Sequence, residues 1–289
     1  LDITQLSKIS AIIKPSTFKS LLNTKIKKGR LVSEVEIFLN EKGLIKDFIA
    51  KGTVKDLKVE LFSNFNLRKT NLSFFADKND ILIKNIFGLL EDIKISDGDI
   101  KLNLEDGIKL NSNFYSKINF DEQVTKKYTR FLKNYNLVKG LKILKADLNN
   151  NLSIELDDTY KVKDYNYSVT GKLEKCNFKL SSPIKNNFLI EEITNIHFSD
   201  LKIKTIFKPK NLKFNGEGKY SLDNSNFLNV NIENILDHAK MNLKLDLDYK
   251  NNIELELINY KKPESSVVNL FLDLEKKKNN LIINKIDFK

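Results

Sequence analysis

The side chains best suited to nucleophilic or acid–base catalysis are few and widely separated in this chain of 289 residues. The only two histidines, His197 and His238, lie about 40 positions apart, and each is alone in its segment. A Ser-His-Asp or Cys-His arrangement needs a base beside its nucleophile, so a strand residue is the favoured interpretation of His197. Cys176 is the only cysteine, which excludes an intramolecular disulfide, and we expect it to be a small packed side chain.

Acidic and glycine-bearing segments could instead hold a cation or a phosphate group. Four carboxylates could bind calcium together with turn carbonyls, but their spacing is not that of an EF-hand: Asp97, Asp99, Glu105 and Asp106. There are no clustered cysteine or histidine ligands for zinc, and the glycines at 216–218 lack the strand–loop–helix setting of a phosphate loop. We predict turns at 96–99 and 105–107 and a bulge at 216–218, with no metal and no cofactor.

Glycoside hydrolysis by paired carboxylates is a further enzymatic reading of an acid-containing chain. That reaction depends on the distance between the two carboxyl groups, which the sequence does not give. A sugar-binding groove usually carries aromatic platforms, however, and this chain has no tryptophan. We therefore predict that the protein is not an enzyme.

The clearest pattern in the chain is a strict alternation over residues 108–120, IKLNSNFYSKINF. Its large apolar side chains fall on even positions and are Ile108, Leu110, Phe114, Ile118 and Phe120. Alternation with a period of two places one face of a strand on apolar surroundings and the other in water. Such a strand would extend over roughly 43 Å, well beyond the usual length of about 5–6 residues.

The same alternation recurs along most of the chain. It is found over residues 30–40, 52–61, 92–104, 144–156, 165–173, 200–207, 211–222, 241–250, 252–260 and 267–274, with a hairpin over 71–90 that turns at 77–80 and a last strand in LIINKIDF. Strands at this spacing with polar turns indicate an antiparallel meander. We predict a mainly β fold, with one long, curved antiparallel sheet or groove that has an apolar face and a lysine/asparagine face.

Two short amphipathic helices are predicted beside this sheet. The first starts at Pro15 and has apolar residues at helical spacing up to Ile26, with Gly29 just past its end. The second covers residues 121–136, has one apolar stripe, and has Asp121 in position to cap its start. We expect the second helix to pack on the sheet.

Composition limits the partners of this sheet. The net charge of +11 suggests nucleic acid or an anionic membrane, but only three of the 49 basic residues are arginine. Bidentate recognition of phosphates and guanines favours arginine, so solvated lysine faces are the better interpretation and no nucleic acid is expected. No run approaches the about 18 apolar residues of a membrane-spanning helix.

Residues 15–120 resemble the AsmA-like envelope proteins, particularly their YhdP-type branch. The likeness lies in a short helix followed by GRLVSEVEIFL, GTVKDLKVEL, NLSFFADKNDILIKNIFGLL and ISDGDIKLNLEDGIKLNSNF. The resemblance implies a bridge-like lipid-transfer protein, whose repeating apolar β-groove carries phospholipids towards the outer membrane. It also implies a periplasmic location, with anchorage in the inner membrane through a segment absent from this chain.

On this reading the chain is a fragment of a longer protein and one continuous sheet. Residues 1–140 form a helix-and-strand block of AsmA-like pattern, and residues 141–289 continue the groove. The implied partners are phospholipid acyl chains, and the inner and outer membranes through segments outside this chain.

The even-numbered apolar side chains are the predicted lining of the groove. They are Ile100, Leu102, Leu104, Ile108, Leu110, Phe114, Ile118, Phe120, Leu144, Leu148, Leu152, Ile154 and Leu156. The pattern leaves two alternatives open. The same residues could form the closed core of a non-catalytic structural or adhesive β-sandwich or solenoid, or the lipid-facing side of a barrel, although the aromatic residues do not form clear girdles.

Overall fold

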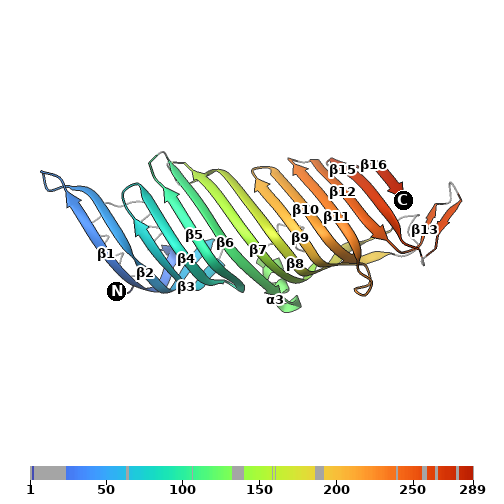
Figure 1. The fold of residues 1–289 in the computed structure, drawn as a ribbon, viewed down its shortest axis with the longest axis horizontal. Coiled ribbons are helices and arrows are strands. Elements are labelled where there is room, and N and C mark those ends of the chain that lie inside the picture. Colours follow the sequence, from blue (N-terminus) through green and yellow to red (C-terminus); the bar gives the residue numbers. More distant parts are fainter. Residues whose placement is uncertain are drawn as a thin grey trace. The chain divides into compact units, whose positions relative to one another are not determined.

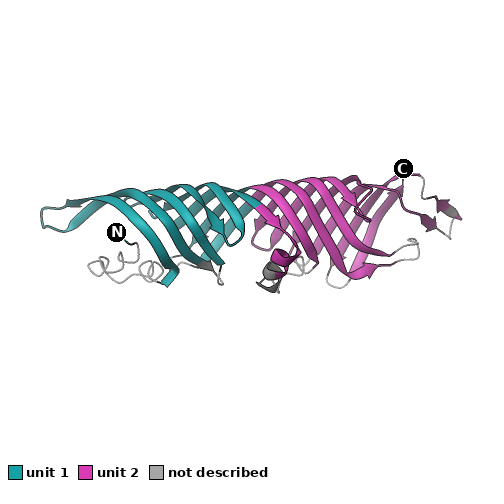
Figure 2. Ribbon diagram, turned by 90° about the horizontal axis from the view of Figure 1, so that it is seen from below, with its two compact units in different colours: residues 1–117, 149–167 teal, residues 118–148, 168–289 magenta. Residues whose placement is uncertain are grey.

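The computed structural model describes residues 2, 24–62, 65–105, 107–131, 140–157, 159, 161–185, 192–238, 240–255, 259–263, 266–277 and 280–288. The chain divides into two compact units (Figure 2). Unit 1 comprises residues 1–117 and 149–167, and unit 2 comprises residues 118–148 and 168–289. The division at residue 140 that we drew from the sequence stays a prediction.

Fourteen strands form one antiparallel sheet in chain order, except that β12 lies beside β15 because β13 and β14 form a separate sheet (Figure 1). The strands that precede the helix α3 are β1 (Ile26–Leu39), β2 (Ile45–Phe62), β3 (Phe65–Ala76), β4 (Asp80–Leu90), β5 (Ile93–Asn103) and β6 (Ile108–Phe120). Those that follow it in this sheet are β7 (Leu141–Leu156), β8 (Val162–Ile184), β9 (Ile193–Lys208), β10 (Asn211–Ser221), β11 (Leu228–Asp237), β12 (Lys240–Tyr249), β15 (Val268–Lys277) and β16 (Asn280–Phe288). The predicted mainly β fold with a long antiparallel sheet is confirmed.

The helices differ from the prediction in number and extent. The helix α3 (Glu122–Phe131) is present, and the Asp121 carboxylate caps it by accepting hydrogen bonds from the N–H groups of Gln123 and Val124, each at 2.9 Å. Residues 132–136 of that prediction lie outside the described residues. So do residues 15–23 of the first predicted helix, whose described residues Thr24 and Lys25 are helical.

The end of the first predicted helix is wrong. Ile26 and Gly29, which we placed in and just after the helix, both lie inside β1. The reason is pairing rather than local propensity, because Ile26 lies opposite Val59 of β2. Cross-strand pairing therefore extends the strand back into a segment whose apolar spacing also suits a helix.

Two of the predicted turns are confirmed and one is wrong. The turn at 77–80 joins β3 to β4, and the Asp77 carboxylate accepts the N–H groups of Asn79 and Asp80 at 2.8 Å. These hydrogen bonds lower the pKa of Asp77. The segment at 105–107 lies between β5 and β6, as expected, whereas SDGD at 96–99 lies within β5.

The SDGD segment belongs to a row of β-bulges that crosses β2 to β5 in unit 1. The residue with positive φ in each bulge is Asp56 (52°), Lys69 (50°), Asn85 (55°) or Asp97 (52°). The pairing register shifts near each of these residues. In β5, Ile95 before the bulge and Ile100 after it both lie opposite even-numbered serines of β6. The bulge therefore places the odd-numbered Ile95 and the even-numbered Ile100 on the same face of the sheet, and it also bends the strand.

The buried residues of unit 1 lie beside this row of bulges. Val54 and Leu57 flank Asp56 and form a hydrophobic cluster with Leu31 of β1. Thr70, which follows the bulge residue of β3, is fully buried, and Ile86 and Ile95 of the next two strands are also buried. The core of unit 1 therefore follows the line along which the strands bend.

In unit 2, the strand β9 contains a β-bulge of the same kind. Asp200 has a φ of 55°, and the register between β9 and β10 shifts between Glu217 and Lys219. The bulge predicted at 216–218 is therefore wrong in position: these residues of β10 pair with β11 without a shift, and the extra residue belongs to β9, opposite Gly218. The next residue, Leu201, forms a buried cluster with Tyr220 and Val230.

The strand predicted over 252–260 is wrong in part. The chain forms a separate hairpin of β13 (Ile253–Leu255) and β14 (Tyr260–Lys262), while β12 pairs directly with β15. The buried Lys262 ammonium donates to the carbonyls of Lys250, Asn251 and Pro263 at 2.6, 3.1 and 3.0 Å. These contacts fix the hairpin to the end of β12, so the segment leaves the large sheet.

The close approach of β9 and β10 at the bulge generates a testable prediction. A Cβ added at Gly218 would lie 2.6 Å from the Cα of Leu201 and 2.7 Å from the Asp200 carbonyl oxygen, both backbone atoms. We expect Gly218→Ala to destabilise the protein by about 1–3 kcal/mol, measured by urea unfolding. At Gly216, the nearest atoms to an added Cβ are side-chain atoms of Phe214 at 3.1 and 3.2 Å, so Gly216→Ala should cost less. Equal losses in both variants would contradict the bulge geometry.

Candidate functional site

The candidate site is the apolar face of the sheet, which the register defines independently in each unit. In unit 1, Leu102 lies opposite Leu110, and Ile100 lies opposite Ser112. Ile108 and Phe114 share the face of Leu110, because they lie on β6 at even spacing from it. The register therefore brings these five predicted lining residues to one face.

The other predicted lining residues are placed less uniformly. Leu104 lies in the turn after β5 and is exposed. In unit 1, Leu152, Ile154 and Leu156 lie on β7 as alternate residues. In unit 2, the structure places Ile118, Phe120, Leu144 and Leu148, of which Phe120 and Leu148 are buried.

The apolar face of unit 1 also includes residues that the sequence analysis did not name. Phe74 of β3 lies opposite Ile83 of β4, which in turn lies opposite Ile100. Ile81 similarly lies between Ala76 and Leu102. The alternation that could have found them changes parity at each bulge, so a single period-two count along a strand misses the apolar residues on one side of its bulge.

Unit 1 carries a small polar network on the same face. The buried Asn150 side chain donates to the Ser116 hydroxyl at 2.9 Å and to the Phe114 carbonyl at 3.2 Å. The Tyr167 hydroxyl donates to the Asn150 side-chain oxygen at 2.7 Å, and burial raises the pKa of Tyr167. Because its polar atoms are paired with one another, this network can lie on an apolar face at little energetic cost.

Unit 2 presents an apolar face of its own. One row runs across six neighbouring strands and consists of Ile203, Gly216, Ile232, Leu245, Leu272 and Ile286. A parallel row consists of Gly218, Val230, Leu247, Leu270 and Phe288. Most of these side chains are half-buried, including those on the interior strands β9 to β12 and β15, which indicates that they are sheltered mainly by one another.

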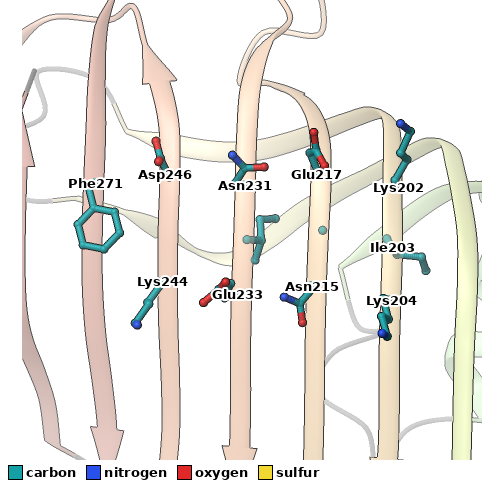
Figure 3. A pocket seen from close by; sticks show the side chains of 12 residues that line it. Lys202, Ile203, Lys204, Asn215, Glu217, Asn231, Glu233, Lys244, Asp246 and Phe271 are labelled. Carbon is teal, nitrogen blue, oxygen red and sulfur yellow. The ribbon is translucent and has the colours of Figure 1, made fainter.

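The opposite face of unit 2 is polar and contains a hollow of about 650 Å³ (Figure 3). Its charged lining consists of three lysines and three carboxylates: Lys202, Lys204, Lys244, Glu217, Glu233 and Asp246. In register, Lys202 lies opposite Glu217, and Glu233 lies opposite Lys244, so opposite charges are neighbours across the strands. The lining of this hollow therefore offers polar contacts and charges that are balanced across neighbouring strands.

The groups that could do covalent or metal chemistry are dispersed. His197 lies on β9, as predicted, and burial together with the charge of Lys175 lowers its pKa. His238 is exposed and lies 2.9 Å from the Asp237 carboxylate. Within the described ranges there is no group of three or more His, Cys, Asp and Glu residues that could hold a metal ion. None of the helices described has the length and apolar character needed to cross a membrane.

Cys176 lies on β8 and is 3% exposed, so it is the small packed side chain that we expected. Burial raises the pKa of its thiol to about 12. The thiolate is the reactive form, and at pH 8 its share falls from about one quarter at the ordinary pKa to roughly one in ten thousand. The thiol is therefore unsuited to nucleophilic catalysis.

This burial predicts the reactivity of the thiol. We expect alkylation of Cys176 at pH 8 to be at least about 100-fold slower in the native protein than in denaturant, as followed by mass spectrometry. The control combines Cys176→Ser with Asn215→Cys, which places the only thiol on the exposed polar face and should react quickly in the native state. Equal native and denatured rates for Cys176 would show that β8 is not packed as described.

Comparisons with known proteins do not assign this chain to a family. No protein-family model, no curated protein and no solved structure matches the chain. The likeness to AsmA-like proteins therefore stays a hypothesis that rests on the pattern of strands and turns.

Proposed function

We propose that the apolar face holds phospholipid acyl chains, and that the protein acts without catalysis as a segment of an envelope lipid-transfer bridge. The observation that supports this proposal is the set of half-buried apolar rows on a single sheet. A closed structural sandwich, the alternative drawn from sequence, needs a second sheet over those rows. In the described part of the chain, all strands except β13 and β14 belong to one sheet.

The dimensions of unit 2 suit an acyl chain. The row from Ile203 to Ile286 crosses six strands and therefore spans about 24 Å at the usual strand spacing. One leaflet of a bilayer is about 15 Å of hydrocarbon, half of the usual core thickness. A chain of that length fits along a row, and each sheltered CH₂ contributes about 0.8 kcal/mol.

This chemistry is consistent with the scarcity of polar motifs. Apolar contacts are non-directional, so a lipid-holding face needs correct parity and shelter rather than fixed catalytic residues. Lysines such as Lys202 and Lys204 project from the opposite, exposed face and can meet anionic headgroups at a membrane surface. The proposed location is the periplasm, with the inner and outer membranes reached through segments outside this chain.

Site-specific crosslinking tests the proposal. A photo-crosslinking residue would replace Leu110 on the apolar face, and Lys109 on the polar face would be the matched control. Leu245 and Lys244 form the equivalent pair on β12 of unit 2. After purification from cells and stringent washing, mass spectrometry would identify phospholipid bound covalently to each variant.

We expect phospholipid adducts at Leu110 and Leu245 and at least about tenfold fewer at Lys109 and Lys244, because the alternate residues face opposite sides. Equal labelling at all four positions would indicate non-specific detergent-like binding and would contradict the proposal. Absence of lipid at all positions in a cooperatively folded protein would also overturn it, since the apolar face would then be covered in another way.

A further inference from the structure

Two further rows on the apolar face of unit 2 contain polar side chains. The first lies beside the row from Ile203 to Ile286 and consists of Thr205, Phe214, Asn234, Leu243, Leu274 and Ile283. The second lies beyond it and consists of Phe207, Leu212, Leu236, Met241, Lys276 and Leu281. The two rows described for the candidate site have no polar side chain, so the polarity of this face rises in one direction along the strands.

Asn234 lies on this face without a hydrogen-bond partner for its side chain. Its side-chain oxygen is buried and accepts no hydrogen bond from the described part of the chain, while the residue as a whole is half-buried. Its neighbours across the strands are Phe214 and Leu243, whose side chains offer no donor or acceptor. Buried polar groups are ordinarily paired, so this amide is suited to a partner that lies on the face.

An asparagine on the apolar face of unit 1 shows the contrast. The Asn150 amide donates to the Ser116 hydroxyl, and its oxygen accepts a hydrogen bond from the Tyr167 hydroxyl. The chain therefore completes the hydrogen bonds of Asn150 and leaves those of Asn234 open. The Asn234 amide can turn about its last side-chain bond, so that its NH₂ group faces a ligand.

Lys276 brings a positive charge to the same face. It is exposed and forms no ion pair or hydrogen bond through its side chain with another described residue. Its neighbours across the strands are Met241 and Leu281. The adjacent Glu275 lies on the opposite face and is paired there with Lys240 at 3.0 Å. The Lys276 ammonium group is therefore available to an anion that lies beside the apolar rows.

The spacing of these two residues suits the polar end of a glycerophospholipid. Asn234 and Lys276 lie two strands and one row apart, which separates their Cα atoms by roughly 12 Å in a flat sheet. The flexible four-carbon stem of Lys276 can bring its ammonium group closer to Asn234. In a glycerophospholipid, the ester carbonyls lie between the acyl chains and the phosphate. An ester beside Asn234 therefore places the phosphate towards Lys276 and the acyl chains over the apolar rows.

We propose that the apolar face of unit 2 selects lipids with an anionic phosphate headgroup, which Lys276 binds, and that the Asn234 amide donates a hydrogen bond to an ester carbonyl of the same lipid. The acyl chains then lie on the rows of Ile232 and Val230. This inference rests on the proposed lipid-holding function and deepens it, because it names the lipid class and the direction in which the lipid lies.

Selective lipid uptake by the full chain tests the proposal. Phosphatidylcholine vesicles would contain equal amounts of dioleoyl phosphatidylglycerol, its dialkyl ether analogue and dioleoylglycerol. After incubation, flotation would separate the vesicles from the protein, and mass spectrometry would quantify the lipids bound to the protein.

Three variants remove or keep one group each, and two controls make the same changes on the opposite face. Lys276→Gln removes the charge, Lys276→Arg keeps it, and Asn234→Leu removes the amide. Lys244→Gln and Asn231→Leu are the controls, because both residues lie on the polar face of unit 2. Circular dichroism would verify that each variant is folded.

We expect the original chain to bind phosphatidylglycerol at least about fivefold over dioleoylglycerol, because only the former has an anion for Lys276. Lys276→Gln should bring this ratio close to one, and Lys276→Arg should retain it. The original chain should also prefer the ester to the ether lipid by about threefold, and Asn234→Leu should abolish this preference. Both control variants should retain both preferences.

The possible failures separate this inference from the proposed function. Equal uptake of the three lipids by the original chain would overturn the inference and leave the lipid-holding function intact. An unchanged headgroup ratio in Lys276→Gln, an unchanged ester preference in Asn234→Leu, or an equal loss of preference in the controls would also overturn it. If the original chain bound no lipid of any kind, the proposed function and this inference would both be wrong.

Discussion

The structure depends on one constraint: each strand must keep its apolar side chains on the same face of a single sheet. A slip of one residue would turn every apolar side chain of a strand into water. The long strands β2 to β5 meet this constraint with bulges at Asp56, Lys69, Asn85 and Asp97. Each bulge restores the parity of the face and bends the strand, and the buried residues gather beside the bends.

Strand pattern and local capping made much of the fold predictable from the sequence. The alternation over 108–120 is β6, and Asp121 caps α3 as its side chain and position suggested. The SDGD segment was misjudged because an Asp-Gly pair suits both a turn and a bulge, since Asp tolerates positive φ. Pairing of β5 with β4 and β6 decides between the two, and neither contact is visible in the local sequence.

The apolar character of the candidate site was predictable from the sequence. The set of strands that contribute to it was less predictable. Residues of β5 and β6 were assigned to a common face, and their register agrees. The rows on β9 to β16 were not named, although their alternation is equally clear in the sequence, because only the register shows which alternations align across strands. The polar network around Asn150 was also missed, since three polar residues far apart in sequence give no local signal.

The apolar rows run across the strands, so the number of paired strands sets their length. A longer strand widens the face but adds no length to a row, whereas each added strand lengthens every row by about 4.8 Å. The length of an apolar path is therefore set by the number of strands joined in register with the same parity.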